Sequence, residues 1–413
     1  MENDEVIPSE IAQAVADPHA YQAWDDWHAK LRTLRATQPF ARGDLPGYDR
    51  FWVASKLHDV QEIARQPQLF RSGYGALETT EQMEVDAARG AQSSSIVFMN
   101  APNHMKYRLL TQNWFQPKNI RALDERIRKL ARSYIDRVVD RDGNCEFWET
   151  VSKPYTLQVI MSILGIPPEH EDVMTALTAM DSAQQVDVEP EQLARYRLEK
   201  IQTSWEYFGQ VTEARRKHPE DDLASVIANS LVNGAPISEH DTGGYFTTIL
   251  VAGHETTTAS LAGAIWALAE RPAELAKVQA NPELIDNLIE EAVRWTTPVY
   301  QFTRTAVQDT EFSGAKVRKG DRIVLSYLSA NRDEDVYSDP FEFRVDRSDY
   351  RHVGFSYGAH MCLGMHLARM EMRIMFEELL PRIRKLELTG EPRRRLTNFV
   401  GGPEYVPVQF TLE

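Results

Sequence analysis

The sequence predicts a mainly α protein with a large helical region and a smaller β region. Apolar and charged positions alternate at helical spacing through the middle of the chain, at residues 119–140, 154–165, 189–216 and 221–232. A longer helical segment covers residues 238–270. Short strand signals, punctuated by Ser-Gly and Lys-Gly pairs, lie between residues 299 and 327, and a final one covers residues 405–412.

A single domain accounts for residues 1–413. The length exceeds the usual size of one domain, but Pro and Gly are dispersed and no linker or low-complexity tract divides the chain. The formal net charge of −15 argues against nucleic acid as a partner. Residues 1–18 have no basic start and no apolar run, so we expect neither a signal peptide nor a membrane anchor. Two cysteines make no disulfide framework, which indicates a cytoplasmic protein.

The N-terminal quarter contains a helix, a strand and an irregular stretch. Residues 20–38 are expected to form a helix with an aromatic side, and residues 51–54 a short strand. Residues 71–98 are poorly periodic and rich in glycine and serine, with three serines at 93–95. We interpret this stretch as a mobile surface loop.

A pair of basic residues opens the next helical pattern. His104 and Arg108 are four residues apart, so they share one helix face. A pair of this kind is usually a solvated surface feature. The alternative is a clamp for a carboxylate or a phosphate group.

The long helix is predicted to begin at Ser238, with Asp241 three residues on, and to end before Pro272. It would span roughly 50 Å at 1.5 Å per residue. Its centre, residues 252–258, contains Gly and three consecutive Thr, which are poor helix formers. The hydroxyl of Thr256 can bond the carbonyl four residues earlier, so we expect either a local opening beside a ligand or a tolerated weak turn. Glu255 in this mostly apolar centre needs a physical reason.

Two further charged motifs follow. Glu291 and Arg294 form an i,i+3 pair, which is usually a surface salt bridge of little consequence. After Pro298 the chain is predicted to be a strand that carries Arg304, which on its own could be an ordinary edge-strand charge.

The most informative stretch is the glycine-rich run at residues 354–364. Cys362 lies there at the start of a helical pattern that continues to Pro381. Unpaired N–H groups and the positive end of the helix dipole favour a thiolate at such a position. A lone cysteine on a turn is more often a buried structural residue. The spacing favours function, because Phe355, Gly358, Cys362 and Gly364 fix four positions in ten residues as F-x-x-G-x-x-x-C-x-G.

This run resembles the heme-ligand loop of cytochrome P-450 enzymes, and the resemblance extends in motif order along essentially the whole chain. It implies the cytochrome P-450 fold and heme b (iron protoporphyrin IX) as cofactor, with Cys362 as the iron ligand. The residues implied to contact the heme are His104, Arg108, Arg304, Phe355, His360, Cys362 and Gly364.

The resemblance also assigns roles on the helices. Glu255 and Thr256 match the acid and alcohol of the [AG]-G-x-[DE]-T motif, which deliver protons in catalysis. Glu291 and Arg294 match E-x-x-R, a structural charge network that a third arginine completes. Arg347 fits this third place, with Arg344 as a nearby competitor.

Four segments look like those of the bacterial terpineol-hydroxylating P-450s. They lie at residues 291–295, 329–334, 358–364 and 398–403. The resemblance implies a monooxygenase that uses O2 and electrons from a ferredoxin, itself reduced by an NAD(P)H-dependent reductase. An acidic ferredoxin needs a basic patch on the cysteine side, for which the candidates are Lys106, Lys118, Arg121 and Arg369.

The expected substrate is a compact hydrophobic monoterpenoid or alkyl-aromatic. The candidate pocket residues are mostly apolar: Thr248, Val251, Ala252, Val299, Tyr300 and Phe399. A steroid or fused-ring hydrocarbon is the alternative within the same mechanism. A heme-thiolate sensor or binding protein is the alternative from another class, but it would not need the acid–alcohol pair. A peroxide-using or isomerising P-450 would be expected to alter that pair.

Overall fold

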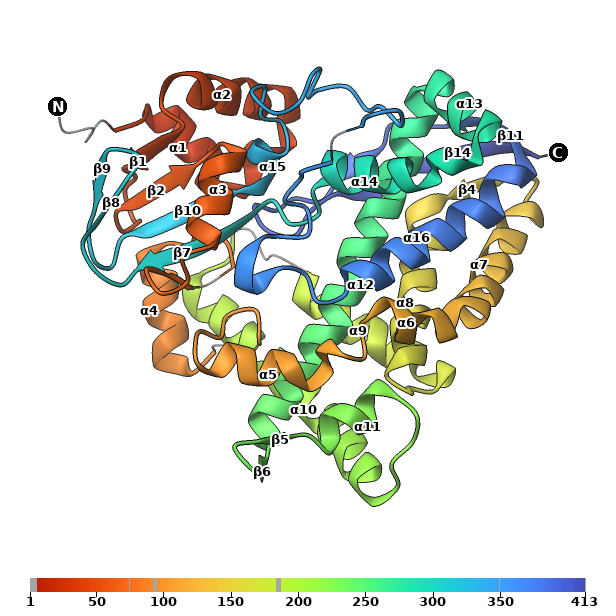
Figure 1. Ribbon diagram of the computed structural model, residues 1–413, viewed down its shortest axis with the longest axis horizontal. Helices are drawn as coiled ribbons and strands as arrows, with labels where there is room; N and C mark the ends of the chain where they lie inside the picture. The colour runs from red at the N-terminus through yellow and green to blue at the C-terminus, as the bar shows by residue number, and fades with distance from the viewer. Residues whose placement is uncertain (1–5, 74, 92–94, 183–186, 349, 413) are drawn as a thin grey trace.

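Helix α12 (Glu239–Glu270) crosses the centre of the molecule in the computed structural model, between a β region and a larger helical region (Figure 1). The structure describes residues 6–73, 75–91, 95–182, 187–348 and 350–412. Ser238 caps α12 as predicted, since its Oγ accepts a hydrogen bond of 3.0 Å from the Asp241 backbone N–H. Helices α8, α10 and α14 pack against α12. The prediction of a mainly helical fold with a smaller β region is confirmed.

The remaining helices have the bounds α1 Ser9–Ala16, α2 Trp24–Thr37, α3 Leu57–Ala64, α4 Thr80–Arg89, α5 Asn103–Gln112, α6 Pro117–Ile120, α7 Asp124–Val139, α8 Lys153–Ile163, α9 Glu171–Ser182, α10 Pro190–Lys217, α11 Leu223–Ala228, α13 Pro272–Ala280, α14 Ile285–Thr296, α15 Tyr327–Ala330 and α16 Met365–Leu379. Helices α2, α5, α7, α8, α10, α14 and α16 lie in stretches predicted to be helical, whereas residues 231–232 of the predicted stretch 221–232 form strand β5. Within the described residues, no helix is both long and apolar enough to cross a membrane.

The main sheet joins strands from distant parts of the chain in the order β1-β2-β10-β7-β3. The strands are β1 Phe40–Gly43, β2 Phe51–Ala54, β3 Phe70–Ser72, β4 Asn144–Glu146, β5 Leu231–Val232, β6 Ala235–Pro236, β7 Gln301–Ala306, β8 Thr310–Phe312, β9 Ala315–Val317, β10 Arg322–Ser326, β11 Ile383–Leu388, β12 Arg393–Arg394, β13 Pro403–Tyr405 and β14 Pro407–Leu412. Strand β7 pairs on both sides, with β10 and with β3. Arg304 therefore does not lie on an edge strand.

The expectation of an irregular loop at residues 71–98 is wrong for residues 80–89, which form helix α4. Thr79 caps this helix by accepting a hydrogen bond from the Gln82 N–H. Arg197 on α10 pairs with Asp86 on α4 and with Glu78 just before it. These tertiary ion pairs hold a segment whose own sequence shows little helical periodicity. Of the three serines, residues 93 and 94 lie outside the described residues, as does residue 74.

The two charged side chains of E-x-x-R meet Arg347 in a buried network. Glu291 and Arg294 have no exposed surface and form two hydrogen bonds of 2.7 Å. Arg347 Nε donates to Glu291 Oε2 at 3.1 Å. The competitor Arg344 contributes only its backbone N–H, at 2.8 Å, while its side chain pairs with Asp346 near the surface.

Candidate active site

A cavity with about 1370 Å³ of empty space, part of it open to solvent, lies between α12 and the segment around Cys362. Its lining comes from the region before α5, from α5 and α12, from the segment after Pro298, from β7, and from the cysteine loop with α16. Every residue that the resemblance places at the heme lines this cavity: His104, Arg108, Arg304, Phe355, His360, Cys362 and Gly364.

The cysteine loop is fixed by backbone geometry. Cys362 N–H donates to the Phe355 carbonyl at 2.8 Å. Gly358 has a φ of 68°, and a Cβ there would lie 2.4 Å from the Ala64 carbonyl oxygen of α3, so no other residue fits. Helix α16 begins at Met365, so Cys362 precedes the helix instead of starting it.

The thiol of Cys362 lies in a low-dielectric site. Burial raises its pKa, and the hydrogen bond from the Gly364 N–H together with the charges of Arg108 and Arg369 offsets only part of this rise. Burial therefore opposes the thiolate that the N–H groups near the helix end favour. A cation beside the sulfur would stabilise the thiolate form.

Two guanidinium groups and two imidazoles gather beside the cysteine loop. The rings of His104 and His360 stack with centroids 4.1 Å apart, and Arg108 donates to the Met361 carbonyl at 2.7 Å. Burial, followed by the charges of Arg108 and Arg304, lowers the pKa of His104 to about 4. Burial, followed by His104 and the same arginines, lowers the pKa of His360 to about 3.

This cluster has an excess of hydrogen-bond donors. Among the described residues, no carboxylate is paired with Arg108 or Arg304, and Arg304 is almost fully buried. Buried cations are normally paired, so the cluster fits a ligand with negatively charged groups.

The facing wall is formed by one side of α12. Thr248, Ala252 and Thr256 line the cavity one helical turn apart. Thr256 Oγ1 donates to the Ala252 carbonyl at 2.8 Å, as the sequence predicted. The helix nevertheless runs without interruption from residue 239 to 270, so the predicted local opening is not observed.

Glu255 lies on another side of α12. It is buried but does not line the cavity, and its Oε2 accepts a hydrogen bond of 2.7 Å from Arg395. The structure therefore brings the alcohol of the acid–alcohol pair to the cavity and holds the acid outside it. Arg395 was missed by sequence reasoning, because it follows Glu255 by 140 residues and no local pattern connects the two.

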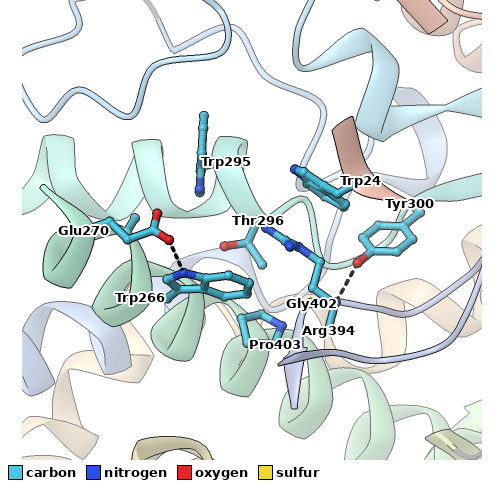
Figure 2. Close-up of a pocket in the computed structure, with 11 residues that line it drawn as sticks. Trp24, Trp266, Glu270, Trp295, Thr296, Tyr300, Arg394, Gly402 and Pro403 are labelled. Carbon is cyan, nitrogen blue, oxygen red and sulfur yellow. Dashed lines mark hydrogen bonds between the residues drawn. The ribbon is translucent and has the colours of Figure 1, made fainter. Parts of the chain in front are cut away.

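Three predicted pocket residues do not belong to the described lining of the cavity: Val251, Tyr300 and Phe399. Tyr300 stacks on Tyr21 with centroids 5.3 Å apart. Its hydroxyl accepts the Gly402 N–H in a separate small pocket (Figure 2).

Phe399 lies behind another ring of the cavity lining. It packs edge-on against Phe302, with centroids 5.3 Å apart, and Phe302 itself lines the cavity. Strand alternation could have identified Phe302, because it lies two residues before Arg304 on β7. Of the predicted pocket residues, Thr248, Ala252 and Val299 do line the cavity.

Comparison with known proteins decides the family. The family model Cytochrome P450 matches residues 46–400. The chain belongs to the cytochrome P450 family. It is 43% identical to Cytochrome P450-terp of Pseudomonas sp, over 98% of both chains, and 34% identical to linalool 8-monooxygenase of Pseudomonas putida, over 94% of this chain and 95% of that one. The crystal structure of CYP108D1 from Novosphingobium aromaticivorans matches with a TM-score of 0.92 and 38% identity, covering 99% of this chain and 100% of that one.

Membership makes the protein a heme-dependent P450 monooxygenase that uses O2 and a redox partner. The residues present fit heme b. Cys362 offers a sulfur in the cavity wall, and the unpaired cationic cluster suits the two propionates. The predictions of the cofactor and of the enzyme class are confirmed.

Proposed function

We propose that this P450 hydroxylates an unactivated C–H bond of a compact hydrophobic molecule, a monoterpenoid or an alkyl-substituted aromatic. The observation that carries the proposal is the lining of the cavity away from the cationic cluster. It is apolar there, with Ile96, Val97, Ala252, Val299 and Phe302. Pockets with few polar groups select by shape. The relative named linalool 8-monooxygenase supports this substrate class.

One hydroxyl in the lining offers a contact for a polar end. Thr248 Oγ1 lies 2.7 Å from the Gly244 carbonyl and 2.8 Å from Ser95 Oγ. Since the carbonyl takes the single proton of Thr248, its oxygen can still accept a hydrogen bond from a substrate alcohol. A fatty-acid carboxylate has no such partner, because the arginines of the lining belong to the proposed propionate cluster.

Each part of the cavity wall has a proposed role in the reaction. When bound, the heme supplies the iron at which O2 is activated for insertion into a C–H bond. Cys362 is the proposed ligand of this iron. His104, Arg108, Arg304 and His360 would hold the propionates, and the apolar wall excludes water and orients the substrate.

Proton delivery is assigned to Thr256 and Glu255. Thr256 Oγ1 donates its proton to the Ala252 carbonyl in the structure; turned about its C–O bond, the hydroxyl would direct this proton into the cavity, give it up there and accept another in exchange. Glu255, at the next position on α12, is the proposed source of that proton. In this scheme Thr256 gives up a proton at the cavity wall, and Glu255 supplies the replacement proton from outside the cavity.

A ferredoxin is the proposed electron donor, docking on the face that carries the cysteine loop. Lys106, Lys118 and Arg121 are the proposed source of positive charge there, and Met361 in the loop is 40% exposed. We exclude Arg369 from the predicted basic patch for ferredoxin. It is half-buried, pairs with Glu290 at 2.9 Å and lies over the Phe355 ring, so it supports the loop instead.

We also propose that residues 1–413 work as one domain in the cytoplasm. Strands at residues 40–72 and 301–326 share one sheet, which supports the single domain. Cys145 and Cys362 are both free, which suits a reducing compartment.

The test is a titration of the ferric enzyme with terpineol, cymene, a long-chain fatty acid and a steroid. Entry of a fitting substrate displaces water from the heme and shifts the iron to high spin. We expect the shift with terpineol or cymene. A shift with the fatty acid or the steroid alone would overturn the substrate class and leave the monooxygenase chemistry intact.

A further inference from the structure

The two carboxylate oxygens of Glu255 face neighbours of opposite character. Oε2 accepts a hydrogen bond of 2.7 Å from Arg395 Nη1, while Oε1 lies 3.5 Å from Nδ1 of His254. The side chains are 5% exposed for Glu255, 0% for His254 and 16% for Arg395. This cluster is therefore almost dry, and its proton positions are set by these few groups.

The proton on His254 can be placed from its contacts. Nε2 lies 3.0 Å from the Lys153 carbonyl oxygen. A carbonyl only accepts, so Nε2 carries the hydrogen. Burial lowers the pKa of His254, opposed by the charge of Glu255 and supported by those of Lys153 on α8 and Arg395 beyond β12. The ring is therefore neutral near pH 7, and Nδ1 presents a lone pair.

That lone pair has no hydrogen-bond partner within the described structure. A buried acceptor without a donor is costly, and the group nearest to it is another acceptor, Glu255 Oε1. A proton placed on Oε1 would lie between the two acceptors, and a closer approach from the present 3.5 Å would complete an O–H···N hydrogen bond. The same carboxyl group can thus be held as an anion by Arg395 or as an acid by His254.

We propose that His254 and Arg395 are positioning residues that make Glu255 a proton-holding site behind the cavity wall. Arg395 stabilises the carboxylate after Glu255 has given up its proton, and His254 Nδ1 accepts the hydrogen bond of the reprotonated acid. The replacement proton comes from solvent on the Arg395 side. The inference deepens the proposed function, because it rests on Glu255 as the acid that serves Thr256.

The segment that carries Arg395 is clamped to α12. The guanidinium of the preceding residue, Arg394, lies 4.0 Å from the Trp24 ring and 4.2 Å from the Trp266 ring of α12 (Figure 2). The Arg395 N–H donates to the Gly402 carbonyl at 3.0 Å. Neighbouring residues of an extended segment point to opposite sides, so one arginine anchors the segment while the next reaches Glu255.

The experiment compares Arg395→Gln with Arg395→Lys and with Arg393→Gln in the heme-loaded enzyme. Arg393 lies on β12, two residues before Arg395, is exposed and stacks on Tyr405, so its variant matches the charge change without touching Glu255. We expect Arg395→Gln to lower the fraction of NADH recovered as product by about tenfold and to change the solvent isotope effect and pH profile of that fraction. Substrate affinity, read from the spin shift, should not change. Arg395→Lys should recover most of the loss, and Arg393→Gln should match the unmodified enzyme.

A second readout does not depend on turnover. In the diamagnetic ferrous carbon-monoxide complex, ¹⁵N NMR reports whether each imidazole nitrogen carries a proton. We expect His254 Nδ1 to lack a proton at neutral pH and to accept a hydrogen bond when Glu255 carries one, and Arg395→Gln to strengthen that hydrogen bond, because the cation paired with Oε2 is gone. A protonated Nδ1 at neutral pH, or a signal that ignores Arg395→Gln, overturns the proposal.

Glu255→Gln distinguishes a failure of the acid role of Glu255 from a failure of the roles of His254 and Arg395. If this variant couples electrons to product as well as the unmodified enzyme, the role of Glu255 as acid fails, and the inference fails with it. If Glu255→Gln uncouples while Arg395→Gln and His254→Asn keep the normal pH profile and isotope effect, only the present inference fails.

Discussion

Two buried glutamates on neighbouring helices differ in how completely their carboxylates are paired. Glu291 on α14 accepts hydrogen bonds from Arg294, Arg347 and the Arg344 backbone, so both oxygens are satisfied. Glu255 on α12 has one arginine and one oxygen that faces a lone pair. A fully paired carboxylate is fixed in one protonation state, whereas a half-paired one can exchange its proton. The first kind holds a fold together, and the second can take part in chemistry.

Substitution of each buried glutamate by glutamine tests this comparison, because glutamine keeps the shape and removes the charge. The largest loss of stability is expected for Glu291→Gln. It leaves Arg294 and Arg347 buried without a counter-charge, which costs about 3–5 kcal/mol. Urea unfolding of the heme-free and heme-loaded proteins measures it. A loss below about 1 kcal/mol would show that the network is not needed for the fold.

Glu290 is an intermediate case with a pH signature. Burial acts to raise its pKa, but hydrogen bonds and charges from Arg369 and His352 outweigh burial and lower the pKa to about 2. A carboxyl group with a lowered pKa stabilises the folded state above its unfolded value near 4.5, and this stability is lost as the pH falls toward 2. Arg369→Gln should flatten the fall of the unfolding free energy between pH 5 and about pH 3. An unchanged slope would mean that Arg369 does not carry the effect.

Glu255→Gln should affect chemistry more than stability. Arg395 is partly exposed, so water can solvate it once the carboxylate is gone, and the unfolding free energy should fall by about 1 kcal/mol. Electrons should pass to peroxide instead of product, as also expected for Thr256→Ala, whose hydroxyl is lost. Peroxide and product are quantified per NADH consumed. If both variants still convert all consumed NADH into product, Glu255 and Thr256 have no role in proton delivery and serve only the packing of α12.

Glu371 on α16 gives the smallest expected change. It is fully buried, its Oε2 has no hydrogen-bond partner among the described residues, and burial raises its pKa well above the ordinary value. A group whose pKa is raised by folding costs stability, and this cost grows with pH above the unfolded value. Glu371→Gln should therefore leave the unfolding free energy unchanged or higher at pH 7 to 8. A loss as large as that of Glu291→Gln would reveal an unseen partner.

The sequence predicted those parts of the site that local spacing encodes. The cysteine loop, the His104–Arg108 pair and the Thr256 back-bond each lie within ten residues, and the structure places them as expected. Helix α4 was missed because ion pairs to α10 stabilise it, and these are invisible in its own periodicity. The position of Tyr300 was wrong for a similar reason, since Tyr21 from the other end of the chain determines where its ring packs.

The order in which the ribosome releases the chain also matters for this molecule. Strand β2 pairs in parallel with β10, with Phe51 opposite Arg322. The N-terminal strands therefore cannot complete the sheet until most of the polypeptide has been synthesised. Pairing over such a separation is slow and leaves strand edges open to other chains meanwhile. Arg304, on the strand next to β10, reaches its place only then. We therefore expect the heme to be captured late in biogenesis, and a shortage of heme or of chaperones to yield aggregated chains with the N-terminal strands unpaired.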